Sequence, residues 1–231
     1  MSTNKIKVIF FDLFFTLITP KYNDVRNEYD VLGITCDQWE EYAEDANIYR
    51  KRALGLVKEP LQIIDDIISS MNIAVDEEAK REILYLREER MKQALLQVDE
   101  TILEVLTVLK KNGIKLCLIS NLDVIDSKHW LESPLSQLLD DWVFSHQVGF
   151  LKPEPDIYKI ALDRMNAKPD ECVLVGDGGS DELKGAKEQG IHTILSDYLL
   201  KRNEIDLKNI MKHTEFTISD FTMLTTLINE M

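Results

Sequence analysis

The chain has 231 residues, of which 45% are hydrophobic, and its formal net charge at pH 7 is -14. This length predicts one large domain, or one domain that carries a smaller second one. Because so negative a molecule repels polyanions, nucleic acid and anionic membranes are excluded as expected partners.

The first predicted element is a strand at residues 6–11, an apolar run rich in β-branched and aromatic side chains. Such a run is typical of a strand that is buried on both faces inside a parallel sheet. The run ends at Asp12. The sequence therefore places a carboxylate at the carboxyl end of a buried strand, where open α/β sheets bind their ligands.

Residues 22–97 follow a different pattern and contain no convincing strand. Apolar side chains recur there at helical spacing among many charged ones. This pattern predicts helices at residues 23–32, 37–56, 59–71 and 76–97. We therefore expect an all-helical unit of about four helices, inserted directly after the first strand.

From residue 99 onward, predicted strands alternate with predicted helices. The strands are at residues 114–119, 142–144, 172–175, 191–195 and 216–218. The helices are at residues 101–112, 126–139 (broken around Pro134), 156–165, 181–188 and 207–211, with a last helix from residue 220. This alternation predicts an α/β fold with a parallel sheet. We expect a Rossmann-like core domain at residues 1–17 and 98–231, and an inserted all-helical domain at residues 18–97.

Polar side chains follow four of these strands. In chain order they are Asp12 with Thr16, Ser120 with Asn121, Lys152, and Asp177 with Asp181. Each group taken alone is typical of a turn or a helix cap. Because the carboxyl ends of parallel strands meet at one edge of a sheet, the four groups together predict a single site.

In these residues the chain resembles the haloacid dehalogenase (HAD) superfamily. An apolar strand followed by Asp-x-x-x-Thr-Leu matches residues 12–17, and a strand that ends in Ser-Asn matches residues 120–121. Lys-Pro-x-Pro-x-x-Tyr matches residues 152–158, and Gly-Asp-x-x-x-Asp matches residues 176–181. The helical insertion after the first motif looks like the C1-type cap of subfamily I. The resemblance covers nearly the whole chain.

The resemblance implies a hydrolase with Asp12 as the nucleophile. A positioned carboxylate can form a covalent intermediate, which in phosphatases of this superfamily is an aspartyl phosphate. Two anions must then approach each other, so cations are needed at the site. The resemblance assigns this role to Lys152 and to a Mg²⁺ ion, since oxygen ligands suit Mg²⁺.

The resemblance also implies a set of binding residues. Thr16, Ser120 and Asn121 match the positions that hold the phosphate of the substrate. The metal positions match Asp12, the backbone carbonyl of Phe14, Asp177, and Asp181 as a direct ligand or as close support.

One residue departs from the motif of most phosphatases in this superfamily. Those enzymes carry a second aspartate two residues after the nucleophile, which protonates the leaving oxygen. Here that position is Phe14, and Phe15 follows it. A phenylalanine transfers no proton, and such general acid–base help contributes about 10²–10⁴-fold to the rate.

Three interpretations follow from this departure. The first is a Mg²⁺-dependent phosphatase that uses another proton donor or a good leaving group. The second is a 2-haloacid dehalogenase-type hydrolase in which Asp12 attacks carbon, without a metal, and a cap arginine such as Arg50 or Arg52 holds the substrate. The third is a catalytically impaired binding or regulatory protein. Retention of Asp12, Lys152, Asp177 and Asp181 favours the first.

We therefore expect a small-molecule partner, a phosphate ester, and either a monomer or a homodimer. The sequence begins with no apolar signal segment and contains no apolar run of 18 residues, so we expect neither secretion nor a membrane span. Its three cysteines are far apart and in no metal-binding spacing. These features favour reduced thiols and a cytoplasmic location.

Overall fold

A six-stranded sheet organises the computed structural model, which describes residues 5–231. The strand order is β3-β2-β1-β4-β5-β6, and every neighbouring pair is parallel. The strands are β1 (Val8–Phe11), β2 (Lys115–Ser120), β3 (Asp141–Phe144), β4 (Cys172–Gly176), β5 (His192–Ser196) and β6 (Phe216–Ile218). The predicted α/β class is confirmed, and β1 lies at the centre of the sheet with all of its residues buried.

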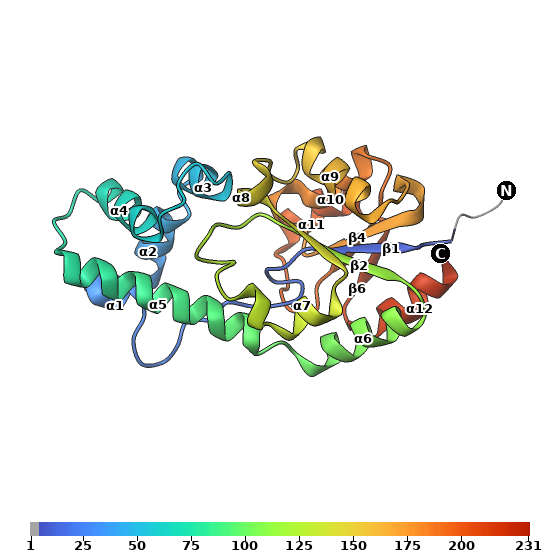
Figure 1. Cartoon of the computed structure of the whole chain (residues 1–231), viewed down its shortest axis with the longest axis horizontal. Coiled ribbons are helices and arrows are strands. Elements are labelled where there is room, and N and C mark those ends of the chain that lie inside the picture. Colours follow the sequence, from blue (N-terminus) through green and yellow to red (C-terminus); the bar gives the residue numbers. More distant parts are fainter. Residues whose placement is uncertain (1–4) are drawn as a thin grey trace.

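Helices cover both faces of the sheet (Figure 1). On one face lie α6 (Glu100–Lys111), α7 (Pro134–Leu138) and α12 (Met223–Glu230). The other face is covered by α9 (Pro155–Met165) and α10 (Glu182–Glu188), with α8 (Ser145–Val148) and α11 (Glu204–Ile210) nearby. Short 3₁₀ turns lie at Trp130–Glu132, Pro169–Glu171, Gly179–Asp181 and Met211–His213. Because both faces are covered, the central strands β1 and β4 are buried along their whole length, as expected for strands inside a parallel sheet.

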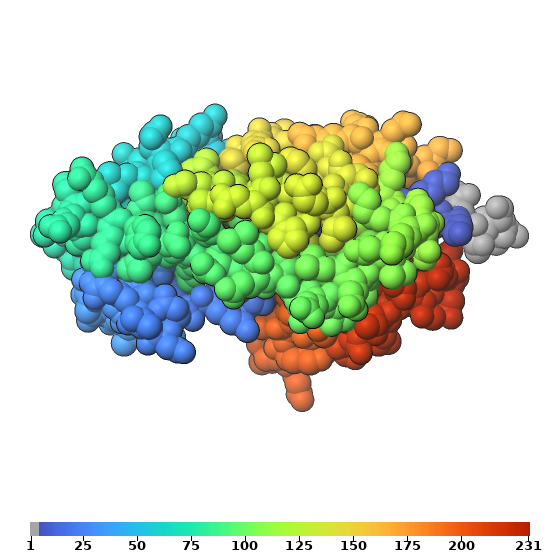
Figure 2. Space-filling view, turned by 60° about the horizontal axis from the view of Figure 1, so that its bottom comes forward, coloured from blue at the N-terminus to red at the C-terminus, as the bar shows by residue number. Residues whose placement is uncertain are grey.

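A helical insertion between β1 and β2 extends away from the sheet (Figure 1). It consists of α1 (Glu28–Leu32), α2 (Cys36–Ala43), α3 (Ala46–Ala53), α4 (Pro60–Ser70) and α5 (Glu77–Leu96). The insertion has its own hydrophobic cluster, which includes Trp39, Ile64 and Ile83. The long α5 is followed after a short break by α6, and in Figure 2 the green atoms of this part of the chain form a continuous band from the insertion to the sheet unit.

The prediction of one helix at residues 37–56 is wrong, because the segment forms α2 and α3. The break lies at Asp45, whose carboxylate accepts hydrogen bonds from the backbone N–H groups of Asn47 and Ile48, at 3.0 and 3.1 Å. Such an N-cap starts a new helix. The predicted helix at 23–32 begins only at Glu28, because the side chain of Asn27 bonds the backbone at Asn23 instead.

Two further segments differ from the prediction. Residues 124–129 form turns rather than the first half of a helix, and the predicted break at Pro134 is instead the start of α7. The short α8 after β3 was not predicted. Among residues 5–231, no helix is long and apolar enough to cross a membrane.

Candidate active site

Asp12 lies at the carboxyl end of β1 and is 7% exposed. Its backbone N–H donates to the Val175 carbonyl of β4, which continues the sheet pairing to this residue. One carboxylate oxygen accepts a hydrogen bond from the ammonium of Lys152, and the other accepts one from the Thr16 hydroxyl at 3.3 Å. The structure therefore brings the first and third predicted motifs into direct contact.

Lys152 is buried and contacts a second carboxylate. Its Nζ lies 2.5 Å from Oε2 of Glu182, the first residue of α10. Burial alone lowers the pKa of Lys152, but the charges of Asp12 and Glu182 outweigh burial and raise it. The lysine therefore stays charged between the two acids.

Glu182 fits against the end of β4 because Gly176 has no side chain. A Cβ atom at Gly176 would lie 2.0 Å from Glu182 Oε1. The same oxygen accepts a hydrogen bond from the Gly178 backbone N–H at 3.1 Å, and the Glu182 carbonyl accepts one from the Tyr158 hydroxyl at 2.8 Å. The glycine of the fourth motif thus makes room for an acid that the sequence reasoning missed.

Three buried acids meet at this edge of the sheet. Oxygen atoms of Asp12, Asp177 and Glu182 all lie within 4.8 Å of one another. Burial raises the pKa of Asp177, and the nearby charge of Asp12 raises it further. Burial and then Asp12 raise the pKa of Glu182 to about 8, partly offset by Lys152. Carboxylate oxygens in such a set suit a hard divalent cation, and a cation here would relieve their mutual repulsion.

Asp181 does not join this cluster. Its side chain is exposed, and its backbone is in the left-handed region at φ 50°, directly after Ser180 at φ 52°. This double turn directs the next residue, Glu182, into the site. The only sequence signal for Glu182 is that a second acid follows Asp181 in the fourth motif.

Asp177 also contacts a residue from outside the motifs. Its Oδ1 accepts the Gly179 backbone N–H at 2.9 Å, and its Oδ2 is paired with the guanidinium of Arg202. Arg202 lies between β5 and α11. Arg202 lies outside the four sequence motifs, so it was not among the predicted site residues.

The second motif supplies two different environments. The Ser120 hydroxyl is fully buried and has no hydrogen-bond partner, which leaves it available to a ligand oxygen. Asn121 instead bonds the backbone of Lys152 with both ends of its amide, at 2.8 and 3.0 Å. The phosphate-binding role of Ser120 and Thr16, which are both fully buried, stays a prediction, whereas Asn121 holds the lysine.

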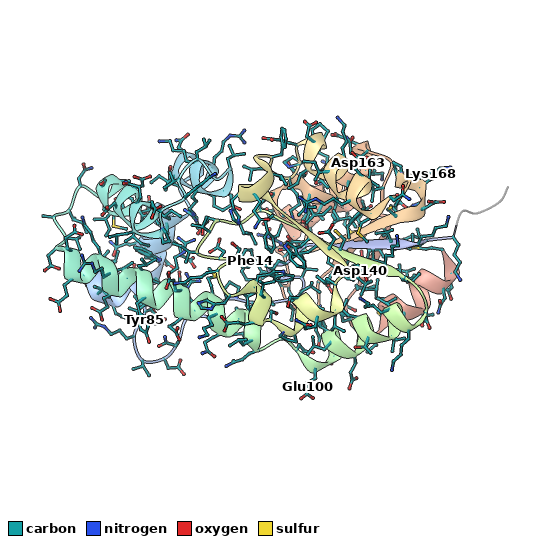
Figure 3. All side chains as sticks on the ribbon, viewed as in Figure 1. Phe14, Tyr85, Glu100, Asp140, Asp163 and Lys168 are labelled. Carbon is teal, nitrogen blue, oxygen red and sulfur yellow. The ribbon has the colours of Figure 1, made fainter. Side chains whose placement is uncertain are left out.

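A cavity of about 510 Å³ opens above Asp12, between the sheet and the insertion. Its apolar wall includes Phe14, Phe15, Tyr22, Trp39, Tyr49 and Met91. Figure 3 places Phe14 near the middle of the molecule, whereas Tyr85 lies on the outside of α5. Phe14 is thus part of the cavity wall, and the role of its carbonyl as a metal ligand stays a prediction.

A parallel sheet with a buried carboxylate–lysine pair at its carboxyl edge, beneath a helical insertion, defines a hydrolase of the capped α/β type. Residues 6–190 match the family of haloacid dehalogenase-like hydrolases, and the chain belongs to this family.

Among curated relatives, the chain is 30% identical over 244 residues to glyceraldehyde 3-phosphate phosphatase from Pyrococcus furiosus. This match covers 95% of this chain and 92% of that protein. It is 41% identical over 107 residues to bifunctional epoxide hydrolase 2 from Rattus norvegicus. That match covers 44% of this chain and 19% of the relative, so the aligned part is about a fifth of the longer protein.

Solved structures share the fold. An HAD family enzyme from Bacteroides thetaiotaomicron, in complex with magnesium and inorganic phosphate, has a TM-score of 0.65 at 21% identity, covering 87% of this chain and 98% of that one. A 2-haloacid dehalogenase from Pseudomonas syringae has the same TM-score at 19% identity, covering 97% of this chain and 99% of that one. The fold alone therefore does not separate the two activities.

Proposed function

We propose that this protein is a Mg²⁺-dependent phosphatase that acts on a small phosphorylated metabolite through an aspartyl phosphate at Asp12. The observation that carries this proposal is the buried group of Asp12, Asp177 and Glu182 around one lysine. With all three acids ionised, the positive charges of Lys152 and Arg202 leave one excess negative charge at this site. A divalent cation removes that excess, and a metal-free reaction leaves it in place.

Each nearby side chain then has a defined task. The Asp12 carboxylate attacks phosphorus, an O–P bond forms, and the bond between phosphorus and the leaving oxygen breaks. Lys152 offsets the negative charge that accumulates between Asp12 and the phosphoryl group. The hydroxyls of Thr16 and Ser120 bind phosphoryl oxygens. A bound Mg²⁺ supplies further positive charge where the two anions meet.

Glu182 is proposed as a metal ligand beside Asp12 and Asp177. It is buried and within reach of both, whereas Asp181 is exposed. Asn121 is proposed as a support for Lys152, because both ends of its amide are already bonded to the lysine backbone. Two relatives with phosphatase activity in their names, one for glyceraldehyde 3-phosphate and one for phosphorylated carbohydrates, support a small phosphorylated substrate in general and no particular leaving group.

Phe14 restricts which phosphates can react well. No acid at that position can protonate the leaving oxygen, so substrates whose leaving group departs as a stable anion are favoured. Acyl and aryl phosphates belong to this class. The aromatic wall of the cavity, with Phe14 and Trp39, suits an apolar leaving group.

The dehalogenase alternative needs an arginine that is free to hold a carboxylate. Arg50 pairs with Glu154 at 2.9 Å, and Arg52 is paired with Glu44 and Asp123, both at 2.9 Å. Neither guanidinium is free to bind a haloacid. The negative charges of Asp12, Asp177 and Glu182 also repel a haloacid anion. These contacts favour the phosphatase.

The deciding experiment measures phosphate release from acetyl phosphate and p-nitrophenyl phosphate with and without Mg²⁺. In parallel, halide release from 2-chloropropionate is measured without metal. We expect Mg²⁺-dependent phosphate release that Asp12→Asn abolishes. Halide release without metal, together with no phosphate release from any substrate, would establish the dehalogenase instead.

The domain boundaries are proposed at the positions that the sequence suggests, with residues 18–97 as the cap and the remainder as the core. Hydrophobic clustering supports this division in part, because Trp39 and Ile83 pack within the insertion while Leu17 and Val98 pack with the sheet. Three side chains of residues 18–97, Ile18, Ala94 and Leu95, pack with the sheet, and Ile125 packs with the insertion.

A further inference from the structure

The backbone of Lys152 is held in place by a single side chain, that of Asn121. The Asn121 amide accepts from the Lys152 backbone N–H at 2.8 Å and donates to the Lys152 carbonyl at 3.0 Å. Asn121 is 7% exposed and Lys152 4%. Because these two bonds fix both sides of the lysine residue, any displacement of Asn121 displaces the ammonium that contacts Asp12.

Helix α3 of the cap bonds directly to Asn121. The hydroxyl of Tyr49, near the middle of α3, donates to the Asn121 carbonyl at 3.2 Å. At the end of the same helix, the Ala53 carbonyl accepts from the Ser145 hydroxyl at 2.7 Å. The same Ser145 oxygen accepts from the backbone N–H of Leu122, the residue after Asn121, at 3.0 Å. Helix α3 therefore holds both polar atoms of the peptide group that follows Asn121, the carbonyl directly and the N–H through Ser145.

The segment that follows Asn121 enters the cap. Ile125 is fully buried and belongs to the hydrophobic cluster of the cap rather than to those of the sheet. Next to it, Asp123 and Asp126 are 1% and 6% exposed. A core segment that leads directly out of the active site is thus embedded in the helical insertion.

Two buried arginines of the cap grip this segment. Arg52 of α3 lies 2.9 Å from Asp123, and Arg87 of α5 lies 2.8 Å from Asp123 and 3.0 Å from Asp126. Arg52 is 2% exposed and Arg87 3%. Breaking one partner of such a buried pair leaves an uncompensated charge, so the grip is strong.

The charges of this cluster are balanced within the protein. Arg52 and Arg87 face Asp123 and Asp126, and Glu44 also contacts Arg52 at 2.9 Å. Two positive and three negative side chains leave no positive charge for a substrate anion. The arginines consequently serve to hold the segment and not to bind the substrate.

We propose that Tyr49, Arg52 and Arg87 are positioning residues of the cap that set the location of Lys152 through Asn121 and Asp123. The part of this proposal that concerns catalysis rests on the proposed function. The mechanical link does not, because it concerns only the order of the Lys152 backbone. The position of the cap and the position of the lysine are then linked.

The test measures backbone hydrogen exchange at Lys152 in the full chain. Arg52→Met removes one of the two arginines that hold Asp123, and Tyr49→Phe removes one hydroxyl. Arg26→Met is the matched control, because Arg26 pairs with Glu82 within the cap and on its surface. We expect faster exchange at Lys152 and at residues 121–127 by about tenfold for Arg52→Met. Tyr49→Phe is expected to have a smaller effect in the same segments, and the control none.

Exchange in β1 and β4 separates this link from general unfolding, because both strands are expected to keep their wild-type protection. Unchanged exchange at Lys152 in both variants overturns the proposal, as does an equal increase in β1. With an active enzyme, kcat is expected to fall in Tyr49→Phe with KM nearly unchanged. If the wild type hydrolyses no phosphate, the proposed function fails while the exchange measurement still decides the link.

Discussion

Arg202 contacts Asp177 at two points: its guanidinium bonds one carboxylate oxygen, and its Nε donates to the backbone carbonyl at 3.3 Å. The other carboxylate oxygen already accepts the Gly179 N–H. Both oxygens of a proposed metal ligand are thus engaged within the protein. A cation that binds Asp177 must share it with Arg202.

Removal of Arg202 is therefore expected to tighten Mg²⁺ binding. In Arg202→Ala a positive charge leaves the site and one Asp177 oxygen becomes free, so we expect the Kd to fall by about 3- to 10-fold, since tenfold corresponds to ~1.4 kcal/mol. Calorimetric titration with Mg²⁺ measures this. Lys201→Ala is the control, because Lys201 pairs with Asp197. Weaker binding in Arg202→Ala would mean that Arg202 orients Asp177 for the metal.

Mg²⁺ is expected to stabilise the folded protein through Glu182 and not through Asp181. At 100 times its Kd a ligand adds ~2.7 kcal/mol, which corresponds to a rise in Tm of roughly 5–10 °C for a chain of this size. Glu182→Gln should lose most of this rise, and Asp181→Asn should keep it. Thermal unfolding with and without Mg²⁺ measures both. The opposite ranking would return the exposed aspartate to the metal site.

The rate of the wild type is expected to depend steeply on the leaving group. With Phe14 in place of an acid, aryl phosphates with acidic phenols should react much faster than alkyl phosphates. Phe14→Asp supplies a proton donor and should accelerate alkyl substrates by about 10²–10⁴-fold. Phe14→Asn is the control, because asparagine is similar in shape to aspartate but has no acidic proton. A phosphatase with equal rates for both leaving groups would already contain a donor.

Stability is expected to fall as the pH is lowered through the range in which His146 titrates. Burial lowers the pKa of His146 below 6.5, while Asp123 and Asp126 act to raise it and Lys58 to lower it. A group with a lowered pKa in the folded state stays neutral there and gains its proton on unfolding. The contribution of His146 is therefore present above pH 6.5 and is lost toward acid.

Urea denaturation at several pH values between 7.5 and 5.5 checks this. His146 lies in α8, which contacts α3. Its Nε2 is 3.0 Å from the Ser127 hydroxyl, and its carbonyl packs against Gly55, shortly after the end of α3. His146→Gln should flatten the pH dependence of the denaturation midpoint. Identical slopes in the wild type and the variant would exclude His146 as the source.

The meeting of Asp12, Lys152 and Asp177 could be predicted because it follows from topology. Parallel strands bring their carboxyl ends to one edge, and each of these residues follows a strand or the loop beyond it. The role of Glu182 could not be predicted, because it depends on the left-handed backbone of Ser180 and Asp181. No periodicity of side chains reports a turn of that kind.

The path of residues 122–127 was equally hidden. An apolar residue such as Ile125 signals burial, but the sequence does not say whether the sheet or the cap buries it. The break at Asp45 was visible in principle, since an acid before Ala46 and Asn47 is an N-cap signal. Charged residues occur on both sides of Asp45, so this N-cap signal did not stand out.

Ile125 has a consequence for exchanging parts between members of this family. The hydrophobic cluster of the cap is completed by a side chain that the chain supplies only after β2. A chimera that grafts residues 18–97 without the segment around Ile125 would carry a hole where Ile125 belongs, Arg87 without its two acids, and Arg52 with Glu44 alone. A functional graft has to include residues 122–127 together with residues 18–97. The unit to be exchanged therefore consists of two separate segments of the chain.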